Sequence, residues 1–238
     1  MNSALEMVDA GAAALSDQRD LPILYSFRRC PYAMRARLSL SSSGEKYLLR
    51  EIVLRDKPAE MIAASPKATV PVLHLQTGEV IDQSLDIMRW TLTRNDPNGW
   101  LSPNGGTLAE MEALIEECES AFKPHLDRYK YATRYGEYTD PLFHREQACL
   151  YLNQLNARLE NAAHLFGDEA RLADFAIFPF VRQFANTDRA WFDAQTFKPL
   201  QEWLSNHLNS ERFQKIMTKW PVWKPGDEEP LLPDTLAH

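Results

Sequence analysis

Two different periods of hydrophobic and polar positions divide the chain near residue 95. In the first part, apolar and β-branched residues cluster in runs of strand length, at residues 23–27 ("ILYSF"), 46–54 ("KYLLREIVL"), 70–75 ("VPVLHL") and 79–84 ("EVIDQS"). Helices are predicted between and after them, over residues 31–43, 58–65 and 85–94, and the first two open at a proline. The predicted order is β-α-β-α-β-β-α, which is typical of an α/β domain.

The second part of the chain repeats its apolar residues every three or four positions, the spacing of one helix face. One such stripe consists of Leu108, Met111, Leu114, Ile115, Cys118, Phe122, Leu126 and Tyr129. A second consists of Cys149, Leu152, Leu155, Leu159, Ala163 and Phe166, with Gly167 as its predicted C-terminal cap. Residues 172–185 ("LADFAIFPFVRQFA") are apolar on nearly every side, which predicts a central buried helix, and further amphipathic segments surround Trp203 and Ile216. We expect an all-helical domain.

A stretch rich in Asn, Pro and Gly separates the two parts and is the predicted linker ("NDPNGWLSPNGG", residues 95–106). With 238 residues, the chain is long enough for two domains. The predicted organisation is a flexible N-terminal extension (1–20), an α/β domain (21–95), a linker (96–106), an all-helical domain (107–225) and a C-terminal tail (226–238).

Composition and charge argue against several classes of function. The formal net charge of −7, without a basic run interleaved with aromatics, disfavours nucleic acid or an anionic membrane surface as the main partner. No apolar run approaches the roughly 20 residues that span a bilayer, and the N-terminus does not read as a secretory signal. Six scattered histidines and three distant cysteines show no ligand spacing, so we expect no metal site and no disulfide framework. Such cysteine usage suits a reducing compartment, and a cytoplasmic location is expected.

One cysteine, Cys30, lies in a sequence that favours a reactive thiolate, "FRRCPYAMRARL". It ends a predicted strand and precedes Pro31, the first residue of a predicted helix, so it occupies the helix cap. The unpaired N–H groups of a helix N-terminus and four nearby arginines would stabilise a negative sulfur and lower the pKa of the thiol. A half-exposed structural cysteine is the alternative. Cys118 and Cys149 instead fall within apolar helical stripes, where a cysteine is usually a small core residue.

The motifs around Cys30 resemble those of a known family. "CPYA" is the Cys-Pro-Tyr-Cys signature of glutaredoxins with the second cysteine replaced by Ala33, and "RRCPYAMRARLSL…VLRDKPAEM…SPKATVPVL…VIDQSLDIMRW" resembles the N-terminal domain of omega-class glutathione transferases. The bacterial glutaredoxin-2 type is similar in outline. The resemblance covers residues 20–95 motif by motif and rests beyond them on length, periodicity and "LADFAIFP". It implies a thioredoxin-like α/β domain followed by an all-α glutathione transferase domain.

The resemblance implies roles for eight residues of the first domain. Cys30 matches the catalytic thiol that forms a mixed disulfide with glutathione. Pro71 matches a cis-proline that leaves the Val70 backbone free to pair with the cysteinyl amide of glutathione. Gln83 and Ser84 match the pair that holds the γ-glutamyl end, with Ser84 opening a helix. Lys57 matches a lysine near the glycyl carboxylate of glutathione, and Leu54 a contact beside it. Tyr32 is expected to flank the thiol.

The chain departs from the family pattern at two places. Most omega-class members have an acidic residue before the serine, where this chain has Gln83, and Asp82 lies one position earlier. Asp174 matches the family's helix-capping aspartate, but the usual Ser or Thr three residues earlier is Arg171, so the reciprocal capping box is expected to be incomplete. Aromatic residues of the helical half could line an acceptor-substrate pocket or belong to the core: Tyr129, Tyr131, Tyr135 and Trp191.

The resemblance implies glutathione-dependent thiol transfer, that is, reduction of a mixed disulfide or of an acceptor such as dehydroascorbate, or deglutathionylation of a small substrate. Glutathione would be a substrate, used with a small-molecule or disulfide co-substrate, and the family implies a homodimer. Because Ala33 replaces the resolving cysteine, a second glutathione would release the enzyme. Two alternatives stay open: a conjugating or dehalogenating transferase, and a non-enzymatic interaction protein with the transferase fold.

Overall fold

The computed structural model describes residues 21–233, which form two compact units. The first unit contains the described residues up to Asn95 together with those from Ile216 onward, and the second contains Asp96 to Lys215. The predicted N-terminal extension, residues 1–20, lies outside the described residues. None of the helices in residues 21–233 is long and apolar enough to cross a membrane.

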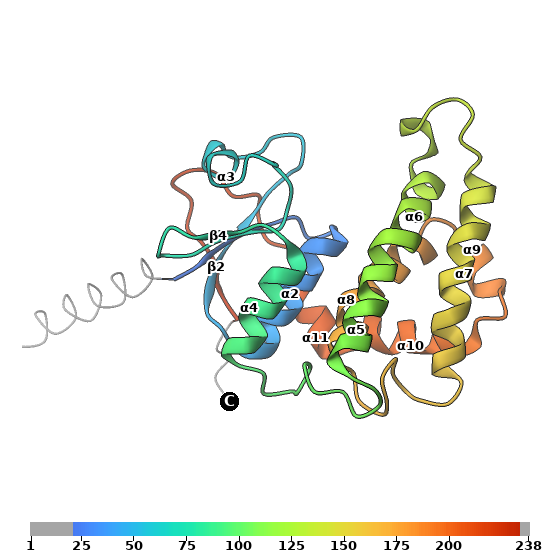
Figure 1. Cartoon of the computed structure of the whole chain (residues 1–238). Coiled ribbons are helices and arrows are strands. Elements are labelled where there is room, and N and C mark those ends of the chain that lie inside the picture. Colours follow the sequence, from blue (N-terminus) through green and yellow to red (C-terminus); the bar gives the residue numbers. More distant parts are fainter. Residues whose placement is uncertain (1–20, 234–238) are drawn as a thin grey trace, which may run out of the picture. The chain divides into compact units, whose positions relative to one another are not determined.

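The first unit is a mixed sheet with helices (Figure 1). Its elements are β1 (Ile23–Ser26), α2 (Pro31–Ser43), β2 (Tyr47–Glu51), α3 (Ala59–Ala64), β3 (Val72–His74), β4 (Val80–Ile81), α4 (Ser84–Arg94) and β5 (Leu231–Leu232). The strand order is β4-β3-β1-β2-β5; β1 and β2 are parallel, and the other neighbouring strands are antiparallel. Up to α4 the order of elements is the predicted one. The thioredoxin-like arrangement is therefore confirmed.

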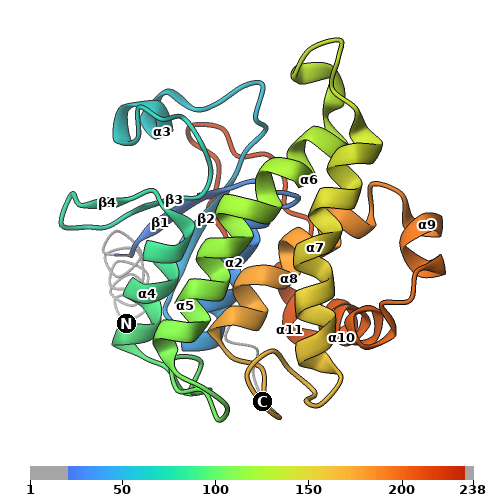
Figure 2. The ribbon, with the colours of Figure 1, turned by 45° about the vertical axis from the view of Figure 1, so that its right-hand side comes forward.

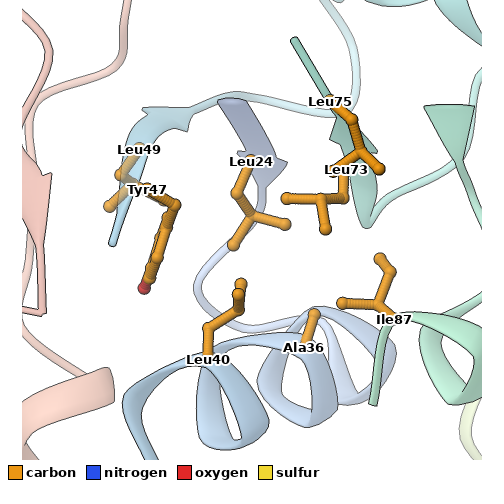
Figure 3. Packing of buried hydrophobic residues seen from close by; sticks show 8 residues of the cluster. All are labelled: Leu24, Ala36, Leu40, Tyr47, Leu49, Leu73, Leu75 and Ile87. Atoms are coloured by element: carbon orange, nitrogen blue, oxygen red, sulfur yellow. The ribbon is translucent and has the colours of Figure 1, made fainter. Parts of the chain in front are cut away.

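Successive side chains of the strands pack on opposite faces of the sheet. Leu24 of β1 points toward Leu40 of α2, and Ile87 of α4 lies in the same cluster (Figure 3). The next residue of β1, Tyr25, belongs to a second cluster that includes Met61 of α3. Helices α2 and α4 therefore pack on one face of the sheet and α3 on the other. This double burial fixes the N-terminal ends of α2 and α4, where predicted site residues lie.

The C-terminal segment returns to the first unit and adds an edge strand. β5 pairs antiparallel with β2, with Leu231 opposite Leu48. The Arg37 guanidinium, 2% exposed, donates to the Ile216 carbonyl at 3.0 Å and to the Glu51 carboxylate at 2.6 Å. The sequence pattern assigns residues up to 225 to the helical domain, whereas the structure packs residues 216–233 with the sheet. The edge of β2 offers unpaired backbone groups to that segment, and an amphipathic pattern does not identify its partner.

The second unit is helical (Figure 2). Its helices are α5 (Leu108–Glu117), α6 (Lys123–Lys130), α7 (Pro141–Leu159), α8 (Leu172–Ala185), α9 (Arg189–Ala194), α10 (Lys198–Asn209) and the start of α11 (Glu211–Ile216), with a π-helical turn (Cys118–Phe122) between α5 and α6 and a 3₁₀ turn (Ala132–Arg134) after α6. Nearly all residues of α8 are buried, as the sequence predicts. In the first predicted stripe, every residue from Met111 to Leu126 is buried, whereas Leu108 is exposed.

The second predicted stripe extends too far. Helix α7 ends at Leu159, and Ala163 and Phe166 lie in the segment that leads to α8. Gly167 does not cap α7. It has a φ of 119°, and an added Cβ would lie 3.4 Å from the Gly105 nitrogen, so glycine is favoured by its backbone conformation and by this close approach. Phe166 is buried although it lies in a loop, and Ala163 is exposed, so the apolar spacing overestimates the helix.

The predicted linker is anchored by a tryptophan. Trp100 is fully buried and stacks on Phe175 of α8, with 3.7 Å between the ring centroids. The Arg171 guanidinium donates to three oxygen atoms of this segment, on Asn98, Gly99 and Asn104. The Arg171 backbone N–H donates to the Asp174 carboxylate at 2.9 Å, so the aspartate half of the capping box is formed. Because a guanidinium has no acceptor, the other half cannot form, and Arg171 binds the linker instead.

Candidate active site

Cys30 occupies the N-cap of α2, as the sequence predicts. Its backbone is extended, with φ −77° and ψ 123°, and Pro31 is the first helical residue. The side chain is half-buried, and the first turn of α2 contains no acidic residue. A helix N-terminus carries a partial positive charge, and no carboxylate in this turn opposes it. The position therefore favours a negatively charged sulfur.

Two of the arginines near Cys30 in the sequence have partners elsewhere in the first unit. The Arg28 guanidinium donates to the Met217 carbonyl at 3.3 Å, and Arg37 pairs with the buried Glu51. Arg29 is exposed, and its guanidinium lies 5.4 Å from the centroid of the Phe27 ring. Side chains at helical spacing point in different directions, so nearness in sequence does not bring these charges to one point.

The Val70–Pro71 peptide bond lies beside the thiol. It is cis, as the resemblance implies, and both residues are buried. The Cys30 thiol donates to the Val70 carbonyl with 3.7 Å between sulfur and oxygen. This contact joins the N-terminus of α2 to the loop that enters β3. A predicted nucleophile and a predicted peptide-binding loop are therefore adjacent.

Ser84 is the first residue of α4 and is 5% exposed. Its hydroxyl accepts a hydrogen bond from Arg35 Nη1 at 3.4 Å. Arg35 is fully buried on α2, and its guanidinium carbon lies 5.7 Å from the centroid of the Tyr32 ring. A buried cation and the first N–H groups of α4 therefore lie beside one serine hydroxyl. The sequence shows Arg35 only as a basic neighbour of Cys30, because 49 residues separate it from Ser84.

The two residues before Ser84 differ in their surroundings. Gln83 is the exposed N-cap residue of α4. The Asp82 carboxylate accepts hydrogen bonds from the Ser65 hydroxyl at 2.7 Å and from the Lys67 ammonium at 3.0 Å. These two donors, Ser65 first, hold the pKa of Asp82 below its usual value. The acidic group of this segment therefore binds the loop before Pro71, and it does not occupy the position directly before the serine.

Lys57 and Leu54 lie in the segment between β2 and α3. Leu54 is 46% exposed and Lys57 is half-buried. Within residues 21–233, the Lys57 ammonium makes no hydrogen bond or ion pair, and no such bond links it to Cys30 or Ser84. The structure therefore brings Cys30 next to Val70 and Arg35 next to Ser84, and within residues 21–233 no hydrogen bond joins Lys57 to either pair.

The remaining cysteines have core-like surroundings. Cys118 is fully buried in the π-helical turn. Cys149 is half-buried on α7, and burial raises the pKa of its thiol to about 11. The Cys149 thiol therefore stays protonated at neutral pH, and the Cys118 thiol is inaccessible to solvent. A thiol at a helix N-terminus is deprotonated more easily.

The four aromatic residues considered for a substrate pocket separate into two groups. Tyr129 and Trp191 both pack on Phe184, at 5.3 and 6.1 Å between ring centroids, and the Arg145 guanidinium lies 4.2 Å from the Trp191 ring. Tyr131 and Tyr135 instead contact guanidinium groups of the second unit, those of Arg134 and Arg128. The structure therefore brings together only Tyr129 and Trp191.

Comparison with known proteins gives consistent matches in both units. Residues 24–99 match the family model for the glutathione S-transferase N-terminal domain, and residues 150–206 match that for the C-terminal domain. Glutathione S-transferase omega-1 of Sus scrofa is 29% identical over 106 residues, which span 44% of each chain. The omega-1 protein of Mus musculus is 22% identical over 200 residues, covering 84% of this chain and 77% of the mouse protein.

Solved structures agree on the fold. A glutathione transferase family member from Pseudomonas fluorescens, solved with two glutathione molecules bound, has a TM-score of 0.71 and 17% identity, covering 84% of this chain and 93% of that one. At this identity the likeness concerns the fold alone. The two family models together match more than half of the chain, one in each unit. The chain belongs to the glutathione S-transferase family.

Proposed function

We propose that this protein is an omega-like, cysteine-type glutathione transferase that transfers thiols with Cys30 as its nucleophile. The observation that carries the proposal is the position of Cys30, at the N-cap of α2 and 3.7 Å from the Val70 carbonyl. A serine or tyrosine in this place would only hydrogen-bond the sulfur of glutathione, whereas a thiolate attacks sulfur. The matches to omega-1 proteins support the class.

Glutathione would bind along the N-terminal ends of α2 and α4. The γ-glutamyl carboxylate fits the Ser84 hydroxyl and the first N–H groups of α4, where the buried Arg35 adds positive charge. The cysteinyl amide would pair with the Val70 backbone as an added strand does. Lys57, which has no anionic partner within residues 21–233, would bind the glycyl carboxylate. This arrangement would place the glutathione sulfur next to Cys30.

The proposed reaction has two exchange steps. The Cys30 thiolate attacks the glutathionyl sulfur of a mixed disulfide, and the substrate leaves as its thiolate. A second glutathione thiolate then attacks the Cys30–glutathione disulfide, which releases oxidised glutathione and restores the Cys30 thiolate. Each step forms one S–S bond and breaks one. Ala33 occupies the position of a resolving cysteine, so the external thiol is required.

The other expected properties belong to the same proposal. A reducing, cytoplasmic environment would keep the Cys30 thiol reduced. A homodimer is expected because the family usually forms one. A conjugating transferase is the second candidate, because Ser84 and the cis-proline loop would bind glutathione for either reaction. A purely scaffolding role gives no reason for a cysteine at the N-cap of α2.

Incubation with oxidised glutathione tests the proposal. We expect intact-mass measurement to show one glutathionyl group per chain, and peptide mapping to place it on Cys30, because Cys118 is buried and the Cys149 thiol is held protonated. The Cys30→Ser variant should gain no adduct, and Cys149→Ser should behave as the wild type. An adduct found mainly on Cys118 or Cys149 would contradict the proposal.

Replacement of the two anion-binding side chains should weaken glutathione binding. We expect Ser84→Ala and Lys57→Ala each to lose a charge-assisted hydrogen bond worth about 1.5–3 kcal/mol, or roughly a tenfold to hundredfold rise in Kd. Because Lys57 is partly exposed, its effect should lie at the lower end. Calorimetric titration with glutathione measures both.

Lys46→Ala provides the matched control for these variants, since Lys46 is an exposed lysine of the same unit. Its glutathione affinity should equal that of the wild type. If both Ser84→Ala and Lys57→Ala keep the wild-type affinity, the proposed position of glutathione is wrong.

A further inference from the structure

Three side chains with metal-ligating atoms converge inside the second unit. His164 Nδ1 lies 3.6 Å and His207 Nε2 lies 4.0 Å from Asp174 Oδ1, and the ligand atoms of the three residues all lie within 4.8 Å of one another. They come from the segment between α7 and α8, from the first turn of α8 and from α10. Their separation in sequence explains why no ligand spacing is visible there.

The two imidazole nitrogens lack hydrogen-bond partners although they are buried. His207 is 5% exposed and Asp174 is fully buried, while the His164 side chain is 23% exposed. Within the described residues, neither His164 Nδ1 nor His207 Nε2 has a hydrogen-bond partner, because both distances to Asp174 are too long for one. Buried polar atoms without partners are rare in folded proteins. Both atoms face the same carboxylate oxygen, which indicates a shared ligand.

The surroundings hold the Asp174 carboxylate and the His207 ring in place. Asp174 Oδ1 accepts hydrogen bonds from the Leu165 backbone N–H at 3.0 Å and from Trp203 Nε1 at 2.8 Å, and Oδ2 accepts one from the Arg171 backbone N–H at 2.9 Å. The His207 ring stacks on Phe178, with 4.8 Å between centroids and 4° between planes. Hydrogen bonds to a ligating carboxylate and a fixed imidazole orientation are typical of the shell around a metal site. Two of the three candidate ligands are therefore held in a fixed orientation.

We propose that His164 Nδ1, Asp174 Oδ1 and His207 Nε2 bind a divalent transition-metal ion, with Zn²⁺ as the best fit. Two imidazoles and one carboxylate form a ligand set that zinc accepts, and zinc–nitrogen bonds of about 2.0–2.1 Å place tetrahedral ligand atoms about 3.3 Å apart. The present separations exceed this value, so the ligands must draw together. His164 lies outside the helices, so we expect its side chain to make the largest shift.

The proposed ion would join the segment before α8 to α10 and is independent of the chemistry at Cys30. Protein dialysed against a chelator and then titrated with Zn²⁺ in a calorimeter should bind one ion per chain. The titration is made in wild type and in Cys30→Ser, because a cysteine thiolate also binds zinc. The expected result is an ion bound in both proteins and a rise in Tm with Zn²⁺ concentration.

Histidine variants then locate the ion. His164→Gln, at a partly exposed loop position, should fold as the wild type by circular dichroism and should bind Zn²⁺ at least about tenfold more weakly, with no rise in Tm. The control is His125→Gln, which removes one ring of the other close histidine pair, whose Nδ1 atoms lie 2.8 Å apart; it should leave zinc binding unchanged. The proposal is overturned if Zn²⁺ does not bind to Cys30→Ser, or if His164→Gln binds Zn²⁺ as tightly as its parent.

Discussion

Replacement of Cys30 by serine should separate two glutathione-dependent activities. We expect thiol transfer from a mixed disulfide, and reduction of dehydroascorbate, to fall by more than about a thousandfold, because a hydroxyl cannot form the disulfide intermediate. Conjugation of glutathione to an aryl halide should hold steady or rise. The serine hydroxyl can donate to the glutathione sulfur and favour its thiolate, and it no longer traps that sulfur as a disulfide. Both rates can be measured on one preparation.

The control for this experiment is Cys149→Ser. Cys149 is half-buried, and burial raises the pKa of its thiol, so its removal should change neither activity. Cys30→Ser should keep its fold, since serine is a favourable N-cap residue. If the wild type has no thiol-transfer activity and Cys30→Ser abolishes conjugation, the protein is a conjugating transferase. If neither activity exists and glutathione does not bind, the interaction-protein alternative is supported.

Removal of the Arg37 guanidinium should strongly destabilise the first unit. Arg37 and Glu51 form a buried ion pair, with side chains 2% and 8% exposed, and Arg37 also donates to the Ile216 carbonyl. In Arg37→Leu the Glu51 carboxylate stays buried and loses one of its two hydrogen-bond partners. The donor that remains is the Arg28 backbone N–H, at 2.6 Å. We expect a loss of about 3–5 kcal/mol in the free energy of unfolding. Urea denaturation measures it, and a matching fall in Tm is expected.

An exposed ion pair provides the control. Arg189 and Asp193 pair at 2.9 Å with side chains about half exposed, so Arg189→Leu should change the free energy of unfolding by less than about 1 kcal/mol. Equal losses in Arg37→Leu and Arg189→Leu would show that the buried pair does not hold the C-terminal segment.

The loss in Arg37→Leu should depend on pH. Burial raises the pKa of Glu51 above 4.5, and Arg37 opposes this shift. Without Arg37 the pKa of the folded carboxyl rises further, so the folded variant binds a proton that the unfolded chain releases. The free energy of unfolding of the variant then increases as the pH falls toward the pKa of Glu51 in the unfolded chain. The deficit of Arg37→Leu relative to wild type should therefore be smaller near about pH 5 than near about pH 8.

Local sequence determined the elements of the first unit up to α4 and the position of Cys30. The strand runs, the prolines at helix starts and the spacing of apolar residues depend on neighbours within a few positions, and the structure has these elements in the predicted order. Cys30 follows a strand and precedes Pro31, and this alone places it at a helix N-terminus. The same local pattern predicted α8 as a buried helix.

Only the tertiary structure decided which distant groups meet. Arg35 reaches Ser84, Arg171 binds the linker, and residues 216–233 pack on the sheet beside β2. Each contact joins residues that are far apart in sequence, and it depends on how loops close and how helices pack. Hydrophobic periodicity reports which side of a segment is buried, but it does not report against what the segment packs. For the same reason the sequence showed scattered histidines, while the fold brings His164 and His207 to the Asp174 carboxylate.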